Sequence, residues 1–210
     1  SMIMSYGQDD RVCAYTSLAA MLGTKAELER TACCLLVDKE EIGSVGATGM
    51  QSRFFENVVA EIISLQGDYT DIKLRRCLAN SKMLSSDVNA GYDPLFAEAF
   101  EKKNASFCGR GVVFSKFTGS RGKSGSNDAN AEYIAKLRKI MDDNNVNYQM
   151  AELGKVDVGG GGTIAYIMSL YGMEVIDCGV PILNMHAPWE IASKADVYEA
   201  KKCYDAFLEN

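Results

Sequence analysis

Two adjacent carboxylates, Glu40 and Glu41, provide chemical groups that a metal-dependent hydrolase uses. They follow Asp38, and a glycine-rich turn over residues 43–46 comes directly after them. Like charges this close repel one another, so something must offset them. In an adjacent acid pair, one carboxylate can ligate a metal while the other stays free as a general base for water. A solvated acidic turn is the alternative interpretation of this segment.

Three further places carry side chains of the same kind, each at the boundary of an expected element. Asp9 and Asp10 precede a helix expected over residues 12–23, Asp87 ends an expected strand, and His186 is the single histidine of the chain. Each has an ordinary alternative: an aspartate can cap a helix, and a lone histidine is often structural. Together, oxygen and nitrogen ligands suit zinc, manganese or cobalt, and two metals that share a carboxylate suit hydrolysis. These residues therefore favour a metal hydrolase.

The elements that must position these groups follow from apolar periodicity. The uninterrupted apolar run over residues 32–37 predicts a buried strand that leads into the acidic segment. This placement suits a site, because ligands bind beyond the carboxyl ends of strands in open α/β sheets. Further strands are expected over residues 82–89, 111–114 and 173–178. Helices are expected over residues 54–67 (as core packing), 72–78, 133–141 (capped by Asn127 or Asp128) and 195–208.

Two glycine-containing segments complete the sequence pattern. Residues 116–126 are basic and predict a mobile loop that lines a cleft. Four consecutive glycines at residues 159–162 precede a short apolar stretch. They predict either an anion-binding helix N-terminus or a tight crossover turn, and the sequence leaves both open.

Composition limits the class of protein. The 210 residues are 47% hydrophobic, enough for one sizeable core, and no apolar run approaches the 18 residues of a transmembrane helix. The net charge of −6 argues against a nucleic-acid partner. There are seven cysteines, an odd number, and none forms a CxxC motif, which predicts reduced core thiols and no cysteine-rich zinc site. Without a recognisable signal peptide, the chain is expected to be cytoplasmic and to bind no membrane.

Five ordered segments carry a family resemblance. They are residues 7–14 (GQDDRVCA), 38–44 (DKEEIGS), 86–87 (SD), 159–164 (GGGGTI) and 185–190 (MHAPWE). They resemble the aminopeptidase I / aspartyl aminopeptidase family of dinuclear zinc metallopeptidases over essentially the whole chain. Asn89 and Asp93, where eukaryotic members have histidines, resemble the bacterial branch. The resemblance implies an α/β three-layer sandwich of the zinc-exopeptidase (phosphorylase/hydrolase-like) type, with a mixed β-sheet between helices.

The resemblance also implies the activity and the metal ligands. Members remove N-terminal amino acids from peptides with two zinc ions per active site, and they form homo-oligomers, commonly dodecamers. By position, Asp9 would bridge the two metals, and Glu41 and His186 would complete one site. Asp87 would ligate the other metal, and Glu40 would be the general base that takes a proton from metal-activated water.

Substrate contacts are implied by the same resemblance. Lys116 and the glycine run, in particular Gly160 and Gly161, would lie near the substrate. A preference for an acidic N-terminal residue would need a cationic pocket, for which Lys116, Arg121 and Lys123 are the candidates.

The chain also departs from the family pattern. Members have a further histidine ligand upstream of the Asp9 motif, and a lid and dimerisation domain before it; this chain has no second histidine. Residues 1–210 are therefore expected to be the C-terminal portion of the catalytic domain, with an incomplete fold. Two hypotheses follow: a zinc-dependent aminopeptidase, or a catalytically incompetent fragment that retains the fold, one metal site and self-association.

Overall fold

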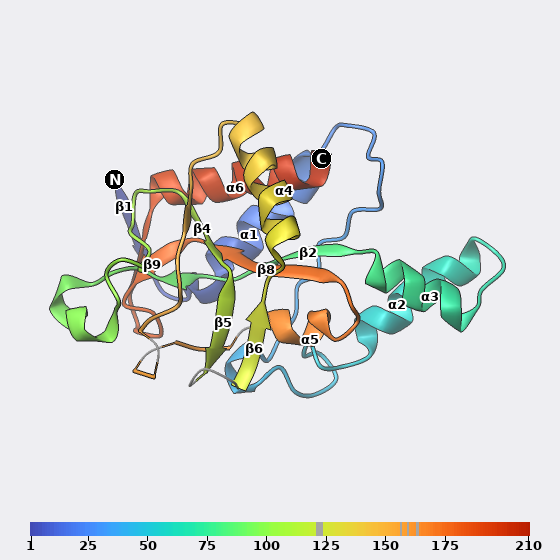
Figure 1. Cartoon of the computed structure of the whole chain (residues 1–210), viewed down its shortest axis with the longest axis horizontal. Coiled ribbons are helices and arrows are strands. Elements are labelled where there is room, and N and C mark those ends of the chain that lie inside the picture. The colour runs from blue at the N-terminus through green and yellow to red at the C-terminus, as the bar shows by residue number, and fades with distance from the viewer. Residues whose placement is uncertain (121–123, 156, 159, 163) are drawn as a thin grey trace.

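The computed structural model describes residues 1–120, 124–155, 157–158, 160–162 and 164–210, and is built around a mixed four-stranded sheet (Figure 1). The strands, in sheet order, are β2 (Lys82–Ser86), β8 (Glu174–Gly179), β4 (Val112–Ser115) and β7 (Tyr148–Met150). β2 pairs with β8 and β4 with β7 in parallel, whereas β4 and β8 are antiparallel. The expected strands at 82–89, 111–114 and 173–178 are thus present.

A second mixed sheet continues the first along two of its strands. Its order is β1 (Met2–Ser5), β10 (Glu190–Ser193), β9 (Pro181–Leu183) and β3 (Asn89–Ala90). The chain continues from β2 into β3 and from β8 into β9. These two stretches remain paired between the sheets: the Asp87 N–H donates to the Cys178 carbonyl at 3.3 Å, and the Asn89 N–H donates to the Val180 carbonyl at 2.9 Å. Asp87 therefore lies at the bend between the two sheets.

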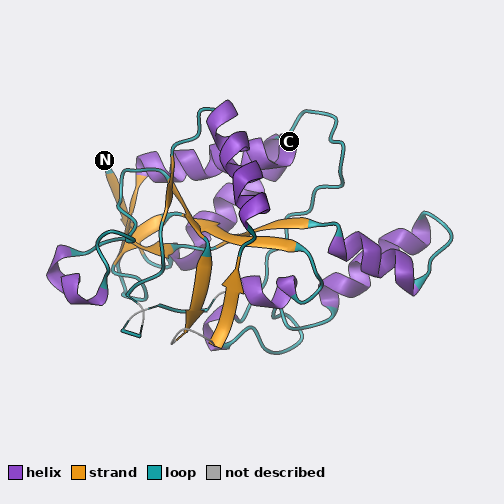
Figure 2. Ribbon diagram, in the orientation of Figure 1, coloured by secondary structure: helices purple, strands orange, loops and turns teal. Residues whose placement is uncertain are grey.

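Helices cover both faces of β8. Ile176 and Cys178 point into a core shared with α1 (Gln8–Gly23), α4 (Ala131–Asp143) and α6 (Lys194–Glu209). Val175, on the opposite face, packs with α3 (Asp71–Ala79) and α5 (Ala165–Ser169). Alternate residues of one strand thus serve two cores, and Figure 2 shows the sheet between its helices. The predicted α/β fold with a mixed sheet between helices is confirmed.

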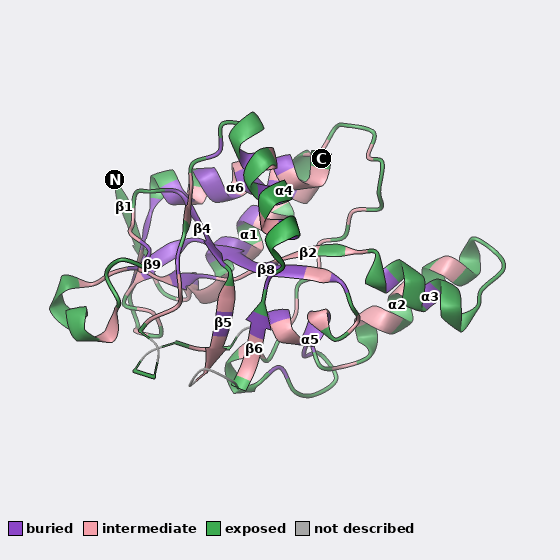
Figure 3. Ribbon diagram, viewed as in Figure 1, coloured by how far each residue is buried: buried purple, intermediate pink, exposed green. Residues whose placement is uncertain are grey.

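The helix expected as core packing is only partly buried. α2 (Phe54–Leu65) forms as predicted and extends from the body together with α3 (Figures 1 and 3). Phe55, Val59 and Ile63 pack against the second core, whereas Phe54 and Leu65 are 62% and 87% exposed. The apolar stripe of α2 is wider than the surface on which the helix lies. The expectation that the whole stripe packs in the core is therefore wrong for the half that is exposed to solvent.

The strand expected over residues 32–37 is not present. These residues join none of the ladders in the described structure. Leu35 and Val37 pack against the second core, and Leu36 is exposed. Their apolar character reflects packing on this core. An apolar run predicts burial, but a strand also needs a neighbouring strand with which to form hydrogen bonds. The acidic segment that follows forms a short 3₁₀ helix, Glu40–Ile42, and a second 3₁₀ helix spans Pro94–Ala99.

The segment expected as a basic loop is a β-hairpin of β5 (Phe117–Ser120) and β6 (Ser124–Asp128). Polar groups attach it to β8: the Thr118 hydroxyl donates to the Asp177 carboxylate at 2.7 Å, and the Asn127 amide donates to the Val175 carbonyl at 3.0 Å. Because these inward-facing residues are polar, the hairpin lacks the apolar alternation that identifies strands. Arg121 and Lys123, candidates for a cationic pocket, lie outside the described residues.

Three smaller expectations have clear outcomes. Asp9 and Asp10 do not cap α1, whose N-cap is Gly7, and α4 begins after Asn130 without a side-chain cap. All seven cysteines are free, but only Cys13, Cys178 and Cys203 are buried. In the part of the chain that the structure describes, every helix is too short or too polar to span a bilayer.

Candidate metal centre

Three segments that are distant in sequence bring a histidine and two carboxylates together. Asp9 comes from the start of α1, Glu41 from the first 3₁₀ helix (Glu40–Ile42), and His186 from the turn between β9 and β10. The His186 Nε2 lies 2.9 Å from the Asp9 Oδ2 and 3.2 Å from the Glu41 Oε1. All three ligand atoms lie within 4.8 Å of one another. We call these residues the triad; the sequence predicted them as one metal site.

Unusual backbone conformations direct the triad side chains. Asp9 has φ −78° and ψ 106°, a non-helical conformation within the first turn of α1. Lys39 and Gly43, on either side of the 3₁₀ helix, both have positive φ. His186 has φ 65°, a conformation that non-glycine residues rarely adopt and that is common at functional sites.

The centre is crowded with negative charge. Burial, together with the charge of Glu41, raises the pKa of Asp9 to about 6, and burial raises that of Asp10 to about 8. Burial and then the charge of Asp10 raise the pKa of Asp87 well above its usual range. Burial and the charge of Glu41 also raise the pKa of Glu40. Ionising these carboxyls together requires positive charge nearby, which a divalent cation would supply.

The triad fits zinc by donor type and spacing. Carboxylate oxygen and imidazole nitrogen are both donor types that zinc binds in proteins. Bonds of the usual length in a tetrahedral site place neighbouring ligand atoms about 3.3 Å apart. The separations of 2.9 and 3.2 Å from the His186 nitrogen are ion-pair distances slightly below this spacing, so a small outward shift of the side chains would admit the ion. The Glu41 and His186 side chains are 58% and 62% exposed, so the centre opens to solvent on their side.

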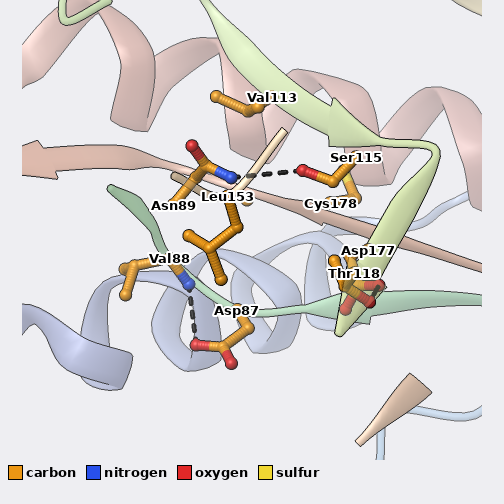
Figure 4. Close-up of a pocket in the computed structure, with 10 residues that line it drawn as sticks. Asp87, Val88, Asn89, Val113, Ser115, Thr118, Leu153, Asp177 and Cys178 are labelled. Carbon is orange, nitrogen blue, oxygen red and sulfur yellow. Dashed lines mark hydrogen bonds between the residues drawn. The ribbon is translucent and has the colours of Figure 1, made fainter. Parts of the chain in front are cut away.

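Asp87 lies outside the triad but near it, since after burial the charges of Asp10 and Asp9 are the next causes of its raised pKa. It lines a small pocket of polar and apolar residues. Its Oδ1 accepts the N–H of Val88 at 2.8 Å, and its backbone occupies the bend between the two sheets. The pocket is also lined by Asp177, Thr118 and Leu153, and Figure 4 shows the carboxylate of Asp87 at its lower edge. Among the described residues, the group of ligand atoms within 4.8 Å of one another includes only the triad.

The expected substrate-contact residues lie on and around the hairpin. The Lys116 ammonium pairs with the Asp128 carboxylate at the base of the hairpin. Gly160 has φ +104°, and a Cβ there would lie 2.9 Å from the Leu153 carbonyl oxygen. A Cβ at Gly161 would meet only the Leu153 side chain, at 3.7 Å. Of these two glycines, only Gly160 has a positive φ and a backbone neighbour too close for a side chain. Gly159 lies outside the described residues.

Sequence reasoning missed two carboxylates. Asp177 is buried in the pocket beside Asp87 and binds Thr118. Glu190 is buried behind the triad and accepts backbone N–H groups from both Asp9 and His186. One signal was available: each is an acidic residue next to apolar strand residues, where a buried charge needs a specific partner.

Zinc binding at the triad is expected to strengthen as pH rises from 5 to 7. With a pKa of about 6, the Asp9 carboxyl is mostly protonated at pH 5, and zinc has to displace that proton. This group alone should lower the dissociation constant about tenfold across that range. Competition titrations with a chromophoric chelator at pH 5, 6 and 7 would measure the change. A dissociation constant that stays constant from pH 5 to 7 would contradict the prediction.

Comparison with known proteins identifies the family. The sequence model of the family described as aminopeptidase I zinc metalloprotease (M18) matches residues 1–208. The chain belongs to this family, as the five sequence segments predicted. It is 65% identical over 210 residues to a probable M18 family aminopeptidase 1 from Clostridium acetobutylicum. That alignment covers 100% of this chain and 45% of the relative, so the chain spans less than half the relative's length.

Solved structures agree on the fold. A crystal structure of an M18-family aminopeptidase from Thermotoga maritima matches with a TM-score of 0.94 at 43% identity, over 100% of this chain and 46% of that one. The structure of the mApe1 dodecamer from Saccharomyces cerevisiae matches with a TM-score of 0.78 at 25% identity, over 98% of this chain and 45% of that one. The α/β fold of this chain, as expected from the sequence, is thus the fold of M18 aminopeptidases.

Proposed function

We propose that the chain carries a zinc site of an aminopeptidase that removes N-terminal amino acids from peptides, with Asp9, Glu41 and His186 as ligands. The observation that carries the proposal is the convergence of these three donors from separate segments to within 4.8 Å of one another. Membership of a zinc metalloprotease family supports the choice of metal. Manganese and cobalt accept the same donor set.

The remaining site residues have defined roles in this proposal. Zinc, when bound, supplies a Lewis acid that activates water and stabilises developing negative charge. Glu40 is the general base that takes a proton from the attacking water. Its raised pKa suits this role, because a base works best with a pKa near the working pH. Asp87, together with Asp9, would hold a second metal, which would add positive charge to stabilise the negative charge that develops during hydrolysis.

Substrate binding and assembly extend the proposal. Lys116, Gly160 and Gly161 contact the peptide near the hairpin. Residues 1–210 form the C-terminal portion of the catalytic domain, and the intact protein is a cytoplasmic homo-oligomer. The dodecamer of mApe1, which matches this chain at 25% identity, supports the oligomeric state.

A second candidate function is favoured by the ligand count. The triad uses the single histidine of the chain, so the metal at Asp87 would have only Asp87 and the shared Asp9 as the ligands proposed on this chain. Two carboxylates hold zinc loosely compared with a complete ligand set. The isolated chain is then a catalytically incompetent fragment that keeps the fold, one metal site and self-association.

Metal stoichiometry on the purified chain tests both candidates. After equilibration with zinc and removal of loosely held metal, elemental analysis is expected to find about one zinc per chain, as the single complete ligand set predicts. Peptidase activity of this chain alone is expected to be low or absent. Two zinc ions per chain, with turnover that Glu40→Gln abolishes and zinc retained, would overturn the incompetent-fragment candidate. No bound zinc would overturn the proposed site on this chain.

A further inference from the structure

Glu190, the first residue of β10, connects two of the three triad residues through their backbones. Its side chain is 2% exposed. The Oε2 accepts the N–H of Asp9 at 3.0 Å, and the Oε1 accepts the N–H of His186 at 2.8 Å. One carboxylate thus binds two segments that lie near opposite ends of the chain and holds them next to each other.

Both segments need such a partner, because neither has regular backbone geometry at the residue concerned. Asp9 is extended inside the first turn of α1, and His186 has φ 65°. A hydrogen bond to a buried carboxylate is stronger than one between neutral groups, so it can hold the non-helical Asp9 in place and offset part of the strain of the His186 conformation. The His186 ring is 62% exposed, so packing contributes little to its orientation, which depends on the backbone position and on the ring's contacts with Asp9 and Glu41.

The charge of Glu190 acts in the same direction. Its carboxylate is buried directly behind Asp9 and His186, so it adds negative potential where the triad donors meet. Two N–H donors stabilise this buried carboxylate, and a cation at the triad would stabilise it further. The residue therefore contributes to both the spacing of the donors and their preference for a cation.

We infer that Glu190 is a positioning residue of the metal centre, which holds Asp9 and His186 at the spacing that a zinc ion requires. This inference rests on the proposed zinc site. Glu190 acts through the two backbones and contacts neither the metal nor the substrate. An outer residue that orients ligands in this way typically accounts for 10- to 100-fold in metal affinity.

Asp196 provides a matched control. It is fully buried, and its two oxygens also accept two backbone N–H groups, from Gly109 at 2.6 Å and Gly111 at 2.7 Å. These contacts attach a loop to α6 and involve no triad residue. Glu190→Gln and Asp196→Asn make the same chemical change, in which one acceptor oxygen becomes an NH₂ group that faces an N–H. Both should destabilise the fold, but only the first should alter the metal site.

The experiment compares zinc affinity and the visible absorption spectrum of bound cobalt(II) in the wild-type chain and both variants. Glu190→Gln is expected to weaken zinc binding about 10- to 100-fold and to change the cobalt spectrum. Asp196→Asn is expected to keep the wild-type affinity within about twofold, with an unchanged spectrum. Wild-type affinity and spectrum in Glu190→Gln, or equal changes in both variants, would overturn the inference. If the wild-type chain itself binds no zinc, the proposed zinc site fails first.

A second measurement does not depend on the variant folding. Hydrogen exchange on the wild-type chain without zinc should show the Asp9 and His186 amides protected, because Glu190 binds both before any metal does. Exchange of these two amides at the rates of an unfolded peptide would overturn the inference, even if zinc binds with high affinity.

Discussion

The His186→Ala chain is expected to lose zinc binding while remaining folded. His186 supplies the only nitrogen among the triad donors, and its removal leaves two carboxylates, of which Glu41 is largely exposed. Since even outer-shell changes cost up to about 100-fold in affinity, loss of a direct ligand should raise the dissociation constant by more than about 100-fold. Elemental analysis after removal of loose metal should fall from about one zinc per chain to none.

A companion variant distinguishes the effect of losing the imidazole from the effect of the strained backbone at residue 186. His186 has φ 65°, which glycine adopts without strain and alanine does not. His186→Gly should therefore be at least as stable as His186→Ala, and both should lack zinc. Because the ring is mostly exposed, the zinc-free stability of either variant should stay within about 1 kcal/mol of the wild-type chain. Stoichiometric zinc at wild-type affinity in either variant would show that the triad is not the metal site.

Gly179→Ala is expected to destabilise the junction of the two sheets. A Cβ at residue 179 would lie 1.7 Å from the Asp87 carbonyl oxygen and 3.0 Å from the Cys13 sulfur. Contacts this short require the backbone to move, and the neighbours at β8 and the bend are buried, so the shift should cost about 3 kcal/mol or more. In a chain of this length that corresponds to a fall in Tm of about 6–12 °C, measurable by thermal unfolding.

The control for this substitution is Gly23→Ala, at the end of α1. There the added Cβ would meet only the Lys201 ammonium, at 3.5 Å, an ordinary contact. Alanine is a better helix former than glycine, so this variant should match or slightly exceed the wild-type Tm. A Gly179→Ala chain with the wild-type Tm would mean that the two strands can separate at Asp87 without cost.

Local sequence patterns predicted the helices well and the strands unevenly. The apolar spacing of α3, α4 and α6 is a property of neighbouring turns, so it can be recognised without the rest of the molecule. Strand pairing depends on distant partners. Residues 32–37 had the composition of a buried strand but no neighbour to pair with, whereas the hairpin of β5 and β6 formed from polar residues held by Asp177 and the Val175 carbonyl.

The sequence by itself determined the family and the chemical groups of the proposed metal centre. Asp9, Glu41 and His186 were recognisable because acidic residues and a lone histidine stand at element boundaries within ordered family segments. Only the tertiary structure decided how these groups meet. It placed them within 4.8 Å of one another, left Asp87 at the bend between two sheets, and put Glu190 behind two of the proposed ligands. The physical reason is that distances between remote segments depend on strand pairing and buried hydrogen bonds, which no local pattern of residues specifies.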